Sequence, residues 1–311
     1  MARAPLNARG AAIVMAMLLA ALAATIAAAL LWQQQRWAGE YERRRDQVQA
    51  QALAMAGVQW ARQILFENAP PTLVQLGQPW AFRLPTTPIE NGSIGGYITD
   101  AQSRLNVNNL ANSATVATAA RLELQRLFAE LGVPNALLNA IADWVDSDDQ
   151  TTPNGGAEDS YYLAQDPPGL AANAPVRRVA ELLAVRGADP TLIARLAPFV
   201  DALDAPTPTM VNVNTAPAEV LVAVVGGLGA AGATALVASR ISKPFANLGD
   251  FRTRLPSGNF DVDESTLTVT SDWFVVTIEA RQSDTVARAR ALLRRSTAPR
   301  AWPDVVWQTV E

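Results

Sequence analysis

The sequence predicts an α+β fold in which a long N-terminal helix packs on a small antiparallel sheet, with a large helical domain inserted between the strands. Three observations lead to this prediction. A helix-forming stretch without proline runs over residues 11–67. β-capable runs follow it and recur near the C-terminus, on both sides of residues 101–254. Those intervening residues carry apolar side chains at helical spacing, so the sheet must close around an insertion.

The first helical stretch predicts a membrane anchor. Residues 11–32 include 22 positions without a charged side chain or a proline. A helix of this length, at about 1.5 Å per residue, crosses a hydrocarbon core roughly 30 Å thick. Arg3 and Arg9 lie on the short side, so the positive-inside rule places the N-terminus in the cytoplasm and the bulk of the chain across the membrane. A single membrane pass is therefore expected.

The helix continues beyond the membrane through residues 33–68, which are rich in Gln, Ala, Arg and Glu. Pro70 and Pro71 end it. Over residues 11–67 such a helix is roughly 85 Å long. We expect the part of this helix beyond the membrane to pack against a sheet.

The sheet is assigned to residues 69–100 and 255–311. A short strand over 95–99 follows an Asn91-Gly92 turn. The C-terminal β-capable runs are 267–270, 273–280, 286–294 and 305–310. Arg288, Arg290, Arg294 and Arg295 are assigned to the third of these as an alternating series, which is typical of an edge strand protected from unwanted pairing.

The insert is expected over residues 101–254. Helical spacing of apolar residues occurs over 115–131, 135–145, 179–185, 190–203, 216–225 and 229–240. A weak internal repeat divides it, because Asn106-Val107-Asn108 opens the first set of helices and Asn212-Val213-Asn214 opens the second.

The composition argues against several functions. The chain has no histidine and no cysteine, which removes the commonest general base, disulfides, thiol chemistry and the usual zinc ligands. We therefore expect no enzymatic activity. A net charge of -4 and a pI near 5.1 also argue against a nucleic-acid-binding surface.

An acidic loop over residues 143–162 is the strongest candidate for a ligand site. Asp146 and Asp148 are two positions apart, Gln150 follows at the same interval, and Glu158 comes about twelve residues after Asp146. This order resembles that of the ligands in an EF-hand loop. Thr151 occupies the position of the required glycine and Glu158 is one residue late, so a true EF-hand is rejected. The alternatives are a loop that binds a hard cation, calcium rather than magnesium, and a solvated acidic turn.

A second stretch, residues 211–251, resembles the helix-hairpin-helix of DNA-binding proteins. Gly226, Gly227 and Gly229 form its glycine-rich turn, and Arg240 and Lys243 are the nearby cations. Two small helices packed through glycine and alanine explain the same pattern without a ligand. We favour this second interpretation because the protein is acidic.

Several blocks, in order, resemble the minor pseudopilin K family of the type II secretion system. They are RGAAIVMAMLLAALAATIAA from Arg9, SRLNVNNL from Ser103, DWVDSDD from Asp143, GAEDSYY from Gly156, ANAPVRRVAELLAVRG from Ala172 and MVNVNTAPAEVL from Met210. The resemblance implies a pilin-like fold whose inserted α-helical domain comprises two SAM-like modules. It also implies a place with minor pseudopilins I and J, and H, in the tip complex that starts and caps the periplasmic pseudopilus above the major pseudopilin. The implied role is the export of folded proteins across the outer membrane.

The same resemblance carries expectations for particular residues. Residues 1–10 match a prepilin leader, so a prepilin peptidase is expected to cut after Gly10 and leave Ala11 as a methylated N-terminus in the inner membrane. An uncut signal anchor is the alternative. The fifth mature position is Met15, where most pilins and pseudopilins carry a glutamate, and this suits the tip of a filament. Family members bind calcium in the helical domain, which here implies Asp146, Asp148, Glu158 and Asp159.

Two rival functions remain open on the sequence. A membrane-anchored, competence-type DNA-binding protein would use the hairpin at residues 226–229 and retain DNA in a salt-dependent way. A signal-anchored periplasmic enzyme would have to build its catalytic site from carboxylates, Lys, Ser or Tyr, and the acidic loop is the sole candidate.

Overall fold

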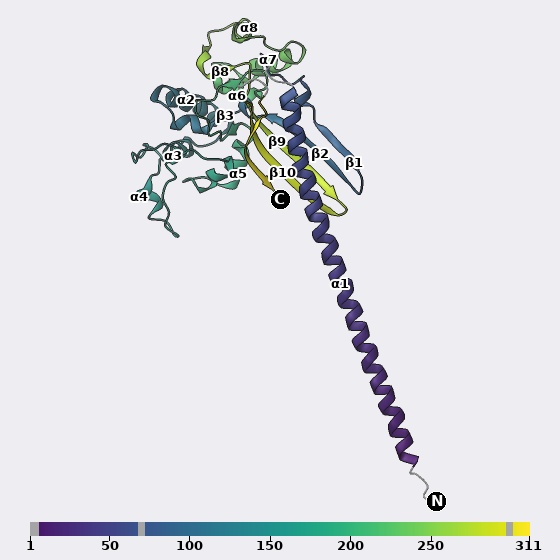
Figure 1. The fold of residues 1–311 in the computed structure, drawn as a ribbon. Coiled ribbons are helices and arrows are strands. Elements are labelled where there is room, and N and C mark those ends of the chain that lie inside the picture. The colour runs from purple at the N-terminus through teal and green to yellow at the C-terminus, as the bar shows by residue number, and fades with distance from the viewer. Residues whose placement is uncertain (1–5, 68–71, 297–300) are drawn as a thin grey trace, which may run out of the picture.

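The computed structural model describes residues 6–67, 72–296 and 301–311. The first half of the predicted leader and the predicted boundary between residues 68 and 69 lie outside these ranges. Figure 1 shows a single long helix that extends far beyond the rest of the molecule, with the sheet and the helical insert gathered around its C-terminal end.

The long helix, α1 (Leu6–Glu67), is continuous from the predicted leader to the sheet and the insert, which together we call the head. Among the described residues it is the one helix long and apolar enough to cross a membrane, and its apolar stretch is exposed on all sides. Its upper part buries one face, which consists of Ala50, Ala54, Val58, Ala61 and Leu65. These residues are three or four apart, which places them on one side of a helix. The expected helix lying on a sheet is confirmed.

The sheet has five antiparallel strands in the order β1-β2-β9-β10-β11. Their bounds are β1 (Leu84–Ile89), β2 (Gly92–Asp100), β9 (Trp273–Gln282), β10 (Thr285–Arg294) and β11 (Asp304–Val310). The sequence did not predict β1, because Pro85 and Pro88 argue against a strand. Both prolines are tolerated there because β1 is at the edge of the sheet.

The prediction that residues 286–294 form an edge strand is wrong, because β11 pairs with β10 and makes it an inner strand. The alternation has another cause. Ala287, Ala289 and Ala291 face α1 and are buried, while Arg288, Arg290 and Arg294 lie on the opposite face. Arg295 does not continue the series, because it follows the end of β10 and is buried. There Arg288 pairs with Glu279 at 3.1 Å and Arg294 with Asp304 at 3.1 Å.

Small side chains let α1 approach the sheet closely. A Cβ atom added to Gly57 would lie 2.8 Å from Cγ2 of Ile278 on β9, which is closer than van der Waals contact. Gly39, lower on the same helix, has its nearest such neighbour at 4.0 Å. Glycine at position 57 is therefore required for the packing of helix on sheet, whereas at position 39 it is not.

We expect Gly57→Leu to lower the free energy of unfolding by about 1–3 kcal/mol, because overpacking forces α1 off the sheet. Gly39→Leu is the matched control, and it is expected to raise stability by up to about 1 kcal/mol through helix propensity. Thermal unfolding of both variants in detergent tests this. Equal stability of the two variants would contradict the close approach.

The insert connects β2 to β9 and contains mostly short elements. Its helices are α2 (Ala114–Leu131), α3 (Asn135–Val145), α4 (Asp159–Tyr162), α5 (Pro190–Leu196), α6 (Ala218–Val224), α7 (Ala230–Ser242) and α8 (Leu248–Thr253). Its two-residue strands are β3 (Leu105–Asn106), β4 (Val200–Asp201), β5 (Val211–Asn212), β6 (Val225–Gly226), β7 (Asp261–Val262) and β8 (Leu267–Thr268). The helix expected over 190–203 ends at Leu196 because Pro198 disfavours helix at the residue before it.

The β-capable run at 267–270 does not join the five-stranded sheet. Instead β8 pairs with β5, and β7 pairs with β6, so residues 261–268 belong to the insert. The sheet resumes only at Trp273, later than the predicted position 255.

The internal repeat corresponds to repeated geometry. Strands β3 and β4 form a short parallel pair, and so do β5 and β8. The side-chain amide of Asn108 binds both the N–H and the carbonyl of Val176, at 3.0 and 2.8 Å. The equivalent Asn214 binds the N–H and the carbonyl of Phe245, at 2.8 and 2.9 Å. Each half of the insert is thus closed by one buried asparagine.

The buried carboxylate of Asp100, at the end of β2, joins the sheet to the insert. It accepts hydrogen bonds from the N–H of Gln102 at 2.8 Å and from Asn212 at 3.1 Å. The hydroxyls of Thr215 and Ser271 each donate to it at 2.6 Å. Asp100 therefore links three parts of the chain: the residues just after β2, the second half of the insert, and the residues just before β9.

Candidate functional site

The acidic loop between α3 and α4 brings three of the predicted ligands together. Asp146, Asp148 and Glu158 each place one carboxylate oxygen within 4.8 Å of the others. Asp146 directly follows α3 and Glu158 directly precedes α4, so the group spans the gap between the two helices. The fourth predicted ligand, Asp159, is not in this group, and one of its oxygens instead accepts the N–H of Ala171 at 2.9 Å.

Two of the three carboxylates have buried oxygens that lack a partner among the described residues, whereas the exposed Asp148 accepts the N–H of Gln150 at 2.8 Å. Glu158 is only 3% exposed, yet neither of its oxygens has a hydrogen-bond partner in the described parts of the chain, and the same holds for the buried Oδ1 of Asp146. Burial raises the pKa of Glu158 to about 7, with further increases from neighbouring acids, Asp143 first. Burial and then Asp148 raise the pKa of Asp146 to about 6. Such a set of buried oxygens fits a hard cation.

Hydrogen bonds outside the group fix the shape of the loop. The fully buried Asp143 accepts the N–H of Thr152, at 2.9 Å to Oδ2. Gly156 lies against the same carboxylate, and a Cβ atom added there would be 2.2 Å from Oδ2 of Asp143. Arg186 donates to the carbonyl of Gly156 at 3.0 Å. The loop is therefore held in one conformation by residues that do not belong to the three-carboxylate group.

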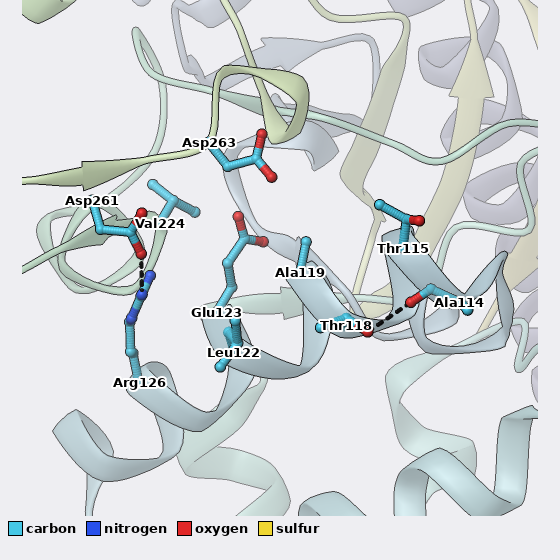
Figure 2. Close-up of a pocket in the computed structure, with 10 residues that line it drawn as sticks. All are labelled: Ala114, Thr115, Thr118, Ala119, Leu122, Glu123, Arg126, Val224, Asp261 and Asp263. Carbon is cyan, nitrogen blue, oxygen red and sulfur yellow. Dashed lines mark hydrogen bonds and ion pairs between the residues drawn. The ribbon is translucent and has the colours of Figure 1, made fainter.

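A separate pocket beside α2 contains another buried acid. Figure 2 shows the carboxylate of Glu123 directed toward that of Asp263, while Arg126 turns away to pair with Asp261 at 2.8 Å. Burial, with a contribution from Asp263, raises the pKa of Glu123 to about 7, and Thr266 and Arg126 only partly oppose this. No sequence pattern singled out this residue, because its neighbours come from the far end of the insert.

This pocket predicts a pH-dependent stability. The folded state binds the Glu123 proton more tightly than the unfolded chain, so stability due to this group falls as the pH rises from about 4.5 to about 7. We expect Glu123→Gln to remove this loss and to be more stable than the unsubstituted chain at pH 8, by roughly 2–3 kcal/mol. Glu130→Gln, an exposed position on the same helix, is the control. Unfolding in saturating calcium at pH 5 and pH 8 measures the difference, and identical pH profiles would contradict the assignment.

The glycine-rich hairpin is covered by other parts of the insert. Gly226 pairs with Asp261 through β6 and β7. Arg240 is buried and donates to the carbonyl of Val213 at 2.7 Å. The hairpin backbone and its main cation are thus engaged in the fold, which favours the structural interpretation over a phosphate site.

The residues predicted to flank the cleavage site lie on α1. Gly10, Ala11 and Met15 are all helical and exposed, Met15 to 63%. The side chain of Met15 is therefore apolar and free to contact lipid or a neighbouring helix.

Models of type II secretion system protein K match residues 103–206 and 211–270, which divide the insert between its two repeated halves. The type II secretion system protein K of Pectobacterium carotovorum subsp. carotovorum is 32% identical over 307 residues, covering 93% of each chain. That of Aeromonas hydrophila is also 32% identical, over 72% of this chain and 73% of its own.

A solved structure shows the same fold. In the crystal structure of the GspK-GspI-GspJ complex from the enterotoxigenic Escherichia coli type 2 secretion system, one chain matches with a TM-score of 0.73 and 27% identity. The match covers 89% of this chain and 99% of the other. With its pilin-like helix and sheet and its helical insert of two repeated halves, the chain belongs to the type II secretion system protein K family.

Proposed function

We propose that this chain is a minor pseudopilin that joins minor pseudopilins I and J in a tip complex and starts the periplasmic pseudopilus of its secretion system. The observation that carries this proposal is the fold that 89% of the chain shares with one chain of the GspK-GspI-GspJ complex. Minor pseudopilin H and the major pseudopilin below the tip are its further partners in this proposal. Its role is structural, and it requires no catalytic residues.

The shape of the molecule supports a position at the tip. The insert lies beside the sheet at the end of α1 that is far from the apolar stretch (Figure 1). A filament of this kind grows by adding subunits from the membrane side, so a bulky head is accommodated only at the leading end. Met15 supports the same position, because it offers no carboxylate to pair with the N-terminal amine of a subunit above it.

The anchor and its processing complete the proposal. The apolar stretch of α1 holds the subunit in the inner membrane, with the short N-terminal segment in the cytoplasm and the head in the periplasm. A prepilin peptidase removes residues 1–10 after Gly10, and the new amine of Ala11 is methylated.

The mass of the N-terminal peptide tests the processing step. We expect the membrane-inserted protein produced with a prepilin peptidase to begin at Ala11 with one added methyl group. Without the peptidase it is expected to keep Met1 to Gly10. An N-terminus that is the same with and without the enzyme would overturn this step and leave an uncut signal anchor.

We further propose that Asp146, Asp148 and Glu158 hold a calcium ion. Carboxylate oxygens are the ligands that calcium prefers, and two of these residues have buried oxygens to which no described residue donates a hydrogen bond. The bound ion supplies positive charge that offsets repulsion among the three carboxylates. Because Asp146 follows α3 and Glu158 precedes α4, a bound ion would hold the C-terminal end of α3 close to the N-terminal end of α4. This would make the loop between the two helices rigid.

A further inference from the structure

A buried carboxylate in the pocket beside α2 has no hydrogen-bond donor of its own. Glu123 is 6% exposed, and its side chain lines this pocket. Among the described residues, the hydroxyl of Thr266 is the one hydrogen-bonding group that acts on it. That hydroxyl donates its single hydrogen to the carbonyl of Asp263, at 3.0 Å. Burying a carboxylate without a donor is costly, so a cation in the pocket would stabilise Glu123.

The carboxylate of Asp263 faces the same pocket from just after β7. Figure 2 shows the carboxylate of Glu123 directed toward it. Oδ1 of Asp263 accepts the N–H and the hydroxyl of Ser265, at 2.9 and 2.6 Å. The side chain is exposed, and its Oδ2 accepts no hydrogen bond from the described residues. The two carboxylates repel each other, and a positive charge between them would offset this repulsion.

The pocket also contains one arginine, but its charge is already paired. Arg126 donates to Oδ2 of Asp261 at 2.8 Å and to the carbonyl of Ala223 at 3.3 Å. Figure 2 shows its side chain turned away from Glu123. Its effect on the pKa of Glu123 is smaller than the opposing effect of Asp263. Of the three acids that line the pocket, Glu123 and Asp263 are therefore left without a counter-ion among the described residues.

The size and walls of the pocket favour an organic cation over a metal ion. Its volume is about 540 Å³, which is within the range of roughly 300–1,000 Å³ typical of sites for organic ligands. Leu122, which is 48% exposed, lines it together with Ala119 and Val224. Calcium takes about six to eight oxygen ligands, whereas two free carboxylates face this space. An aliphatic stem that ends in a cation matches an apolar wall beside buried acids.

We propose that this pocket binds a primary ammonium group on an aliphatic stem, with the ammonium between Glu123 and Asp263 and the stem against Leu122. The three N–H donors of an ammonium fit acceptors that come from two separate carboxylates. The group is supplied either by a lysine of another polypeptide or by a free diamine, which share this chemistry. Because α2 belongs to the first half of the insert and Asp263 to the second, binding would link the two halves. The site is independent of the calcium loop and of the proposed place in the tip complex.

The test uses the full-length protein in a neutral detergent at pH 8, with saturating calcium and with sodium chloride keeping the ionic strength constant. The probes are lysine blocked as its N-acetyl amide and the diamine 1,5-diaminopentane, and blocked norleucine is the uncharged control. We expect the unfolding midpoint to rise with the logarithm of the concentration of at least one probe. A rise with blocked lysine identifies a polypeptide lysine as the occupant, whereas a rise with the diamine alone identifies a free diamine. No rise with either probe, or an equal rise with blocked norleucine, would overturn the proposal.

Two variants place the probe in this pocket. Glu123→Gln is expected to lose the probe-dependent rise, and because it is expected to be more stable than the unsubstituted chain at pH 8, the loss does not come from unfolding. Asp263→Asn keeps an oxygen for Ser265 and is expected to weaken the rise. Glu130→Gln, exposed on the same helix, is expected to keep it. An undiminished rise in Glu123→Gln or in Asp263→Asn would place the probe elsewhere and contradict the site.

Discussion

In saturating calcium, Glu158→Gln is expected to unfold at a lower temperature than the unsubstituted chain, whereas in chelator it is expected to unfold at a higher one. The reversal follows from two opposing effects at one side chain. Without a cation, three carboxylates whose oxygens lie within 4.8 Å repel one another, and glutamine removes one of the charges. In the proposed calcium site that carboxylate is a ligand, so its loss is expected to weaken calcium binding.

The magnitude depends on how far calcium exceeds its dissociation constant. A ligand that binds only the folded state adds about 2.7 kcal/mol at 100 times that constant, and this gain is what the variant loses. Asp159→Asn decides whether the fourth predicted ligand takes part, and we expect it to keep the calcium response because Asp159 lies outside the group. The exposed Glu130→Gln is the control for the substitution itself.

Calorimetry of these variants in calcium and in chelator provides the measurement. The decisive result is the crossing of the two midpoints for Glu158→Gln. If calcium leaves the unsubstituted chain unchanged, the loop is a solvated acidic turn and the metal proposal fails.

The second large effect is expected at Asp100. We expect Asp100→Ala to lower the free energy of unfolding by about 2–5 kcal/mol at pH 5, because a buried donor left unpaired costs about 1–3 kcal/mol. The N–H of Gln102 and the hydroxyl of Ser271 lose their acceptor, and Asn212 and Thr215 lose one of theirs. Because the sheet and both halves of the insert meet at this carboxylate, the loss is expected to affect the whole head.

The effect has a defined pH dependence. Burial raises the pKa of Asp100 from 3.8 to about 6, so the folded state binds more protons than the unfolded chain in this interval. The stability that the protonated group contributes is therefore lost as the pH rises from about 4 to about 6. The cost of Asp100→Ala is expected to be smaller at pH 8 than at pH 5, since the variant also removes a buried charge.

Denaturant unfolding at the two pH values measures this, with Asp204→Ala, an exposed acid in the same region, as the control. A cost that grows with pH, or no cost at pH 5, would show that the carboxylate does not organise the junction.

Local patterns in the sequence predicted the long helix, the insertion, its two halves and the acidic loop. The helices and the acidic loop depend on spacing within one segment, as for the apolar face of α3 or the paired Asp146 and Asp148. The insertion and its two halves follow from β-capable runs on both sides of it and from the repeated Asn-Val-Asn. The edge strand β1 was missed because Pro85 and Pro88 conflict with strand propensity, and only its place in the sheet makes them acceptable.

The buried charges could not be predicted because their partners are distant in sequence. Asp100 meets Asn212 and Ser271 across 112 and 171 positions, and no local pattern links them. Glu123 likewise faces Asp263 through the packing of the insert (Figure 2). In the sequence Arg295 continues an alternating series of arginines, and only the fold shows that its side chain is buried with no hydrogen-bond partner among the described residues.

The most direct test of the central claim is the mass of the complex formed when the full-length chain is produced with minor pseudopilins I and J of its own secretion system and purified in detergent. The account predicts one assembly that contains a single copy of each of the three proteins. Elution of this chain alone, with I and J in separate fractions, would contradict its place in the tip complex.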